Sequence, residues 1–203
     1  MTNFPLRTKR KKETRRKLVA AARHLFLTKG YDNTTLDEIA ERSGLHVQTL
    51  YRHFSSKQEL AGAGDEYWFQ LFKDAINDPE RTSTTFEFWR GWMKMTVKEL
   101  SKREDGKSNL YTAHLELHLS SPTILGQTMA VRAKYEDVLT EYLAKDFQMD
   151  GEGVSLPRLV AGMLLAGNGY VRGRYYREKG DIMGDTLKVI DEVTALFGSY
   201  VKS

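Results

Sequence analysis

The chain has 203 residues, of which 40% are hydrophobic and 29% are charged, with only four prolines. This composition is typical of a soluble globular protein of one or two domains and excludes an intrinsically disordered chain. The absence of cysteine excludes disulfides, iron–sulfur clusters, thiolate zinc sites and a cysteine nucleophile.

The net charge of +4 is distributed unevenly along the chain. Residues 1–57 carry 13 Lys and Arg against 5 Asp and Glu, whereas residues 58–203 carry 18 against 22. A basic first quarter followed by an acidic remainder indicates a head that binds a polyanion and a body with another task. The alternative is a basic tail that only keeps the protein in solution.

The first 17 residues are basic and contain no long apolar run, so we expect no signal peptide. The longest strongly apolar uncharged segment, residues 159–171, is too short to span a bilayer and predicts a buried helix. Together with the missing cysteines, these features favour a cytoplasmic protein without a membrane partner.

Most of the sequence shows the spacing of apolar residues that is typical of helices. No segment alternates apolar and polar residues as a half-buried strand would, so the sequence predicts an all-α fold. Gly30 ends the first expected helix, and Thr35 with Glu38 forms a capping box at the second. Gly44 makes a tight turn before the third. The helices expected in this part of the chain cover residues 8–29, 36–42, 47–53 and 57–76.

Two short helices joined by a glycine turn, as expected for the second and third helices, are typical of a helix-turn-helix. Ser56 and Glu59 are expected to form a capping box at the fourth helix. Longer helices are expected after Pro79, over residues 84–102, 109–119, 123–147, 156–178 and 186–201. We therefore expect a helix-turn-helix domain with a basic arm over residues 1–57 and an all-helical domain over 58–203.

The segment 35–60 reads TLDEIAERSGLHVQTLYRHFSSKQEL and closely resembles the DNA-binding signature of the TetR/AcrR family of bacterial transcription regulators. The matching positions are Leu36, Ile39, Ala40, Gly44, Thr49, Leu50, Tyr51, Phe54, Lys57 and Leu60. The resemblance implies a DNA-binding head, a helical domain that binds an effector and mediates dimerisation, and a homodimer.

The helix at 47–53 is expected to enter the major groove, where base edges are distinguishable. Gln48 can pair with adenine there, and Val47 can contact a thymine methyl group. By the resemblance, Thr49 and Tyr51 contact phosphate, whereas His46 and Gln48 depart from the usual residues of the family. The expected DNA-binding residues are Thr34, Thr35, His46, Val47, Gln48, Thr49, Tyr51, Arg52, His53, Lys57, Lys11 and Lys12.

The rest of the basic leader, including Arg15 and Arg16, is expected to add unspecific electrostatic attraction or to act as a minor-groove arm. An alternative for Val47 and Gln48 is ordinary solvated helix surface.

Aromatic and methionine side chains are dense over residues 86–95 and suit either the core or a pocket for an apolar ligand. His114 and His118 lie four residues apart and could share a metal, but no third ligand follows at a convincing spacing, so no metal or other cofactor is expected. The expected ligand-binding residues are Phe86, Trp89, Trp92, Met93, Tyr111, His114, His118, Tyr135 and Asn168.

Small residues on one face of the helix at 156–178 allow close approach of another helix, and the last helix carries two apolar stripes. One stripe suffices for the core of a monomer, so the second is expected to meet a partner subunit; alternatively, it packs within the same chain. The expected dimer-interface residues are Gly162, Ala166, Gly169, Gly173, Val193, Leu196 and Tyr200.

Together with the resemblance, these features predict a ligand-responsive regulator, a repressor that a small apolar or aromatic effector releases from a pseudo-palindromic double-stranded DNA operator. The alternative is a constitutive dimeric DNA-binding protein without an effector. An enzyme is not expected, because the sequence has no Gly-rich phosphate loop, nucleophile elbow or placed Ser/His/Asp set.

Overall fold

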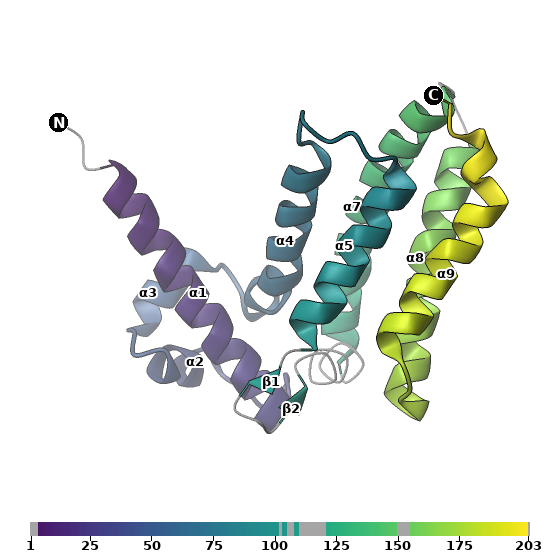
Figure 1. Ribbon diagram of the computed structural model, residues 1–203. Coiled ribbons are helices and arrows are strands. Elements are labelled where there is room, and N and C mark those ends of the chain that lie inside the picture. Colours follow the sequence, from purple (N-terminus) through teal and green to yellow (C-terminus); the bar gives the residue numbers. More distant parts are fainter. Residues whose placement is uncertain (1–3, 102, 105–107, 110–120, 150–154, 203) are drawn as a thin grey trace. The chain divides into compact units, whose positions relative to one another are not determined.

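The computed structural model describes residues 4–101, 103–104, 108–109, 121–149 and 155–202, and these residues form an all-α protein (Figure 1). A two-residue antiparallel ladder between β1 (Arg103–Glu104) and β2 (Ser108–Asn109) lies at the predicted break near residue 105. The helices are α1 (Phe4–Lys29), α2 (Leu36–Arg42), α3 (Val47–His53), α4 (Lys57–Ile76), α5 (Thr85–Leu100), α7 (Pro122–Phe147), α8 (Leu156–Glu178) and α9 (Ile182–Phe197), with a final 3-10 turn at Gly198–Tyr200. The helix predicted over 109–119 lies outside the described residues, apart from Asn109 in β2.

Contacts divide the described residues into two compact units. The first unit, the head, lies within Met1–Tyr67 and Glu116–Thr128, and the second, the body, lies within Trp68–Leu115 and Met129–Ser203. The division falls inside α4, ten residues beyond the boundary expected at residue 57, so the first turns of α4 belong to the head.

The head is built around a buried face of α1, on which Leu18 and Phe26 are almost completely inaccessible to solvent. Ile39 of α2 and Leu50 of α3 bury against this face, and Phe54 closes the cluster just after α3. α1 packs on α2 and α2 on α3, as a helix-turn-helix requires.

Local sequence signals determine where these helices begin and end. The Thr35 hydroxyl accepts from the Glu38 amide at 3.2 Å, and a Glu38 carboxylate oxygen accepts from the Thr35 amide at 2.9 Å, which confirms the predicted capping box. Gly30 and Gly44 have φ values of +85° and +69°, the left-handed conformation that glycine adopts without a steric penalty.

The predicted starts of α1 and α9 and the predicted capping box of α4 need correction. α1 begins at Phe4 instead of Thr8. The Ser56 hydroxyl accepts from the Glu59 amide, but the Glu59 carboxylate accepts from the amide and hydroxyl of Ser55 at 2.7 and 2.8 Å, because Ser55 offers two donors to one oxygen. The last helix begins at Ile182 instead of Thr186, because Asp181 caps it by accepting from the Gly184 amide at 2.9 Å.

The body has a core rich in aromatic side chains, contributed by α4, α5 and α7. Phe72 of α4 is fully buried at its centre, with ring centroids of Tyr135, Trp92 and Trp89 at 4.7, 5.5 and 5.8 Å. Tilted and edge-on pairs of this kind stabilise a core beyond the area they bury.

The helices α8 and α9 lie side by side in the body, and α9 also packs on α5 (Figure 1). Gly167 permits the close approach of α8 and α9, because a Cβ at this position would overlap the Val189 side chain. Arg90 of α5 forms a two-pronged ion pair with Asp191 of α9, at 2.7 and 3.0 Å.

We predict that Phe72→Ala lowers the free energy of unfolding by about 3–5 kcal/mol, because the substitution leaves a cavity among packed rings. Leu71→Ala, at the adjacent and partly exposed position, should cost less than about 1 kcal/mol. Chemical denaturation followed by circular dichroism measures both variants, and equal losses would contradict the described core.

Candidate nucleic-acid interface

The helix α3 turns one face into the head and the other towards solvent. Leu50 is fully buried and Phe54, just after the helix, is 1% exposed, whereas Gln48 and Arg52 are exposed and Tyr51 is 57% exposed. Three polar or aromatic side chains, at positions 48, 51 and 52 of one short helix, therefore face solvent and can reach a partner.

The other expected DNA-binding residues of this part of the head differ in exposure. His46 occupies the N-cap position, and within the described chain its side chain makes no capping hydrogen bond, as expected from its departure from Ser or Thr. Val47 is half-buried at the edge of the head core, and the hydroxyl of half-buried Thr49 accepts from the Arg52 guanidinium at 2.9 Å. Lys11 and Lys12 are exposed on α1.

His53, the last residue of α3, lies in a positively charged environment. Burial lowers the pKa of its imidazole, and the charges of Lys11, Arg15 and Arg52 lower this pKa further. The neutral imidazole is therefore favoured, and positive charge at this end of α3 is concentrated on Lys and Arg.

The two threonines before α2 differ in accessibility. Thr34 is 1% exposed, and its hydroxyl donates to the Gly30 carbonyl at 2.7 Å, so the structure does not present the Thr34 side chain to DNA. Thr35 is exposed at the N-cap of α2, where its hydroxyl already accepts from the Glu38 amide.

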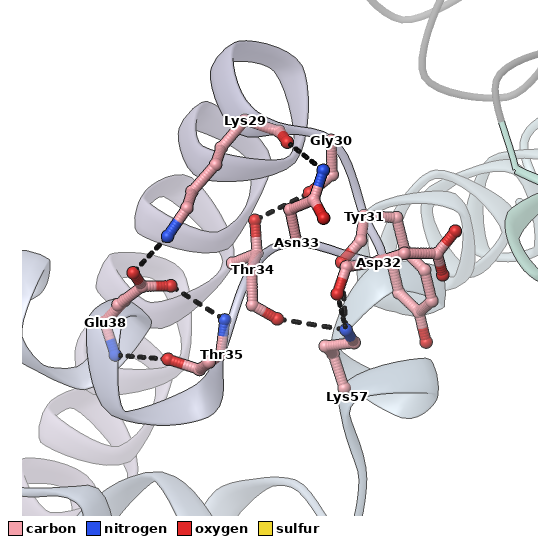
Figure 2. A network of polar contacts seen from close by, with 9 residues as sticks. All are labelled: Lys29, Gly30, Tyr31, Asp32, Asn33, Thr34, Thr35, Glu38 and Lys57. Atoms are coloured by element: carbon pink, nitrogen blue, oxygen red, sulfur yellow. Dashed lines mark hydrogen bonds and ion pairs between the residues drawn. The ribbon is translucent and has the colours of Figure 1, made fainter.

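Lys57, at the first residue of α4, reaches back to the loop that joins α1 and α2 (Figure 2). Its ammonium group donates to the carbonyl oxygens of Tyr31 and Thr34 at 2.9 and 3.0 Å, and a third carbonyl oxygen, that of Asp32, lies at 3.5 Å. The ammonium also lies 4.4 Å from the centroid of the Tyr31 ring. An ammonium group has three protons, so a DNA phosphate would have to replace one of these partners.

A second polar contact fixes the same loop to α2 (Figure 2). Lys29, the last residue of α1, forms an ion pair with Glu38, whose carboxylate also accepts from the Thr35 amide. The hydrogen bond from Lys29, followed by that from Thr35, lowers the pKa of Glu38 to about 2. The carboxylate therefore remains charged throughout the physiological pH range.

Arg15 approaches α3 from α1, although the sequence places it within the basic leader. Its guanidinium donates to the His53 carbonyl at 2.8 Å and lies 4.1 Å from the centroid of the Phe54 ring. The sequence carries a weak signal for these contacts: Arg15 precedes the buried residue Leu18 by three positions and so lies at the edge of the buried face of α1.

In the body, the expected ligand-binding residues are mostly part of the aromatic core. Phe86 and Trp89 are each 2% exposed and Trp92 is 8% exposed, whereas Met93 and Tyr135 are half-buried against the same core. The expected residues Tyr111, His114 and His118 lie outside the described residues.

Two of these residues carry buried polar atoms without partners. The Trp89 indole nitrogen and both amide atoms of Asn168 have no hydrogen-bond partner among the described residues, although Asn168 is only 5% exposed. A buried polar group without a partner costs about 1–3 kcal/mol, which makes these atoms candidates for ligand recognition.

One side of α8 and the end of α9 expose large apolar side chains. Leu159 and Tyr170 are 54% and 66% exposed, and Leu196 on α9 is 64% exposed. Of the small residues, Ala166 and Gly169 are exposed, and Gly162 and Gly173 are half-buried. The exposed apolar and small residues of α8, of the end of α9 and of the 3-10 turn after it include Leu159, Met163, Ala166, Gly169, Tyr170, Tyr176, Leu196 and Tyr200.

Val193 has to be removed from the expected dimer interface. It is 6% exposed and packs in the core of its own subunit with Ile190, so the side of α9 that carries these two residues faces inward. Leu196, near the end of α9, and Tyr200, in the 3-10 turn that follows, are exposed. No helix in the described part of the chain is long and apolar enough to cross a membrane.

Comparisons with known proteins agree with this architecture. Residues 18–63 match the family model described as "Bacterial regulatory proteins, tetR family". The chain is 28% identical over 156 residues to the HTH-type transcriptional regulator TcmR of Streptomyces glaucescens, a match that covers 77% of this chain and 62% of TcmR.

Solved structures show the same fold. SmeT, the repressor of the Stenotrophomonas maltophilia multidrug efflux pump SmeDEF, superposes with a TM-score of 0.70 at 24% identity, covering 93% of this chain and 91% of SmeT. The structure of SmeT in complex with triclosan also gives a TM-score of 0.70, at 22% identity, covering 94% of this chain and 93% of that one.

We predict that Lys57→Met, which keeps the apolar stem and removes the donors, lowers the free energy of unfolding by about 1–3 kcal/mol, because buried carbonyls lose a charged partner. Lys73→Met changes an exposed lysine of the same helix and should cost less than about 0.5 kcal/mol. Thermal unfolding measures both. If the two variants unfold alike, the Lys57 contacts do not stabilise the loop.

Proposed function

Because the chain belongs to the TetR family of bacterial regulatory proteins, we propose that it is a transcriptional repressor that binds a pseudo-palindromic operator as a homodimer and is released by a small apolar or aromatic effector. The observation that supports this proposal most strongly is the exposed face of α3, which is backed by the buried side chains of Leu50 and Phe54. The family members matched above are named as regulators, and the proposal requires no catalysis.

The chemistry of α3 suits the major groove. Gln48 can form paired hydrogen bonds with adenine, and Arg52 can form them with guanine. Tyr51, Thr49 and His46 lie on or beside the same helix and can contact the phosphate backbone, which fixes the register of the protein on DNA. The exposed Lys11 and Lys12 add sequence-independent attraction.

A homodimer explains the exposed side of α8 and α9. Large apolar side chains interspersed with Ala166 and Gly169 form a surface that a second copy can cover by close helix approach. A two-fold axis through such an interface would present two α3 helices, and the operator would then have two related half-sites about one helical turn, or a multiple of it, apart.

The effector is proposed to bind in the body. An aromatic core with the unpartnered Trp89 nitrogen and Asn168 amide suits a ligand with apolar rings and at least one polar group. SmeT, which shares the fold, binds triclosan, a molecule of this type. The alternative function, a constitutive DNA-binding dimer, would leave these buried polar atoms without a ligand.

We predict that Gln48→Ala relaxes the preference at one base position of each half-site and costs about 1–3 kcal/mol of binding to the preferred duplex. Gln58→Ala removes an exposed glutamine of α4 and should leave the preferred sequence unchanged. The measurement is selection of duplexes from a random library by each variant. An unchanged motif with Gln48→Ala would show that α3 does not read bases through this residue.

We predict that Leu196→Glu converts the dimer into a folded monomer, because burying a carboxylate at the interface is unfavourable and the side chain is exposed in the single subunit. Met95→Glu places the same charge on an exposed side chain of α5 and should leave the dimer intact. Light scattering at micromolar concentration reports the mass of each; a 23.3 kDa species for the unmodified protein would refute the dimer.

We predict that Asn168→Leu leaves the free protein equally or more stable, by up to about 1–3 kcal/mol, because it removes an unpaired buried amide. The same substitution should abolish the thermal stabilisation that small phenols, triclosan among them, give the unmodified protein. If none of these phenols stabilises the unmodified protein or releases it from DNA, the constitutive alternative is favoured.

A further inference from the structure

We infer that Arg15 is a positioning residue that holds the carboxyl end of α3, instead of being one of the leader's DNA contacts. The inference rests on the proposed role of α3 as the helix that reads DNA. It is carried by three contacts of one guanidinium group with α3, with the residue after α3, and with α4.

The first contact stabilises the end of the helix. The last carbonyl groups of a helix have no partner within it, and a positive charge there interacts favourably with the helix dipole. Arg15 Nη1 donates to the His53 carbonyl at 2.8 Å, and His53 is the last residue of α3. The guanidinium thus supplies both the missing donor and the favourable charge.

The second contact fixes the residue at which the chain leaves α3. Phe54 has an extended backbone, and its side chain is 1% exposed in the head core. The guanidinium carbon of Arg15 lies 4.1 Å from the centroid of this ring, so the planar group covers the face of the ring. A lysine could retain the charge at this position but not the planar contact.

The third contact compensates the charge of Arg15. Its Nη2 lies 3.7 Å from a carboxylate oxygen of Glu59, whose other oxygen accepts from the amide and hydroxyl of Ser55. Arg15 and Glu59 therefore connect α1, the exit from α3 and the first turn of α4. Because the positive charge already has a negative partner, it contributes little to the release of counterions from DNA.

Arg16 provides a matched control. It is exposed on α1 next to Arg15, so Arg16→Ala removes the same charge from the same leader. The probes are a duplex that the unmodified protein selects from a random library and a random-sequence duplex of equal length. Fluorescence anisotropy over a range of salt concentrations gives affinities and salt slopes for both.

We expect Arg15→Ala to lower affinity for the selected duplex about tenfold or more, with less than about a twofold change for the random duplex and an unchanged salt slope. Arg16→Ala should weaken both duplexes by the same factor and reduce the salt slope by about one. Arg15→Lys keeps the charge and should still lose discrimination between the duplexes. This variant decides the matter if circular dichroism shows that Arg15→Ala does not fold.

Equal losses on both duplexes with Arg15→Ala, or full discrimination with Arg15→Lys, would overturn the inference. Failure of the proposed function has a different signature, because the unmodified protein would then select no sequence at all.

Discussion

A helix of seven residues is too short to be stable alone in water, and α3 has this length. Its orientation therefore depends on the tertiary contacts of Leu50 and Phe54, which anchor one side of it in the core of the head. The same burial leaves Gln48, Tyr51 and Arg52 facing outward. A surface that reads DNA has to be both rigid and exposed, and in this protein the rigidity comes from the residues behind the helix.

The basic residues of the head serve two purposes. Arg15, Lys29 and Lys57 are engaged within the head, where they hold the end of α3, the start of α2 and the loop after α1. Lys11 and Lys12 are exposed. The excess of 13 basic over 5 acidic residues in the first 57 therefore overstates the charge available to DNA. Not every lysine or arginine of the head can be counted as a phosphate contact, because some of these side chains stabilise the head itself.

Local signals made much of the fold predictable, and long-range contacts account for the errors. The bounds of α3 and α8, the capping box of Thr35 and Glu38, and the turns at Gly30 and Gly44 follow from neighbouring residues. The burial of Thr34 and Val193 depends on packing against other helices, which a single sequence does not reveal. The partners of Lys57 and Arg15 lie 23 to 44 residues away along the chain and were missed for the same reason.

Methylation protection of a duplex that the protein selects from a random library tests most directly whether α3 enters the major groove. Guanine N7 lies in the major groove, so dimethyl sulfate reports on the groove that α3 is proposed to enter. We expect two protected tracts, related by two-fold symmetry and about 10 base pairs or a multiple of this apart. Full reactivity of guanine N7 throughout a tightly bound duplex, or protection confined to the minor groove, would contradict this expectation.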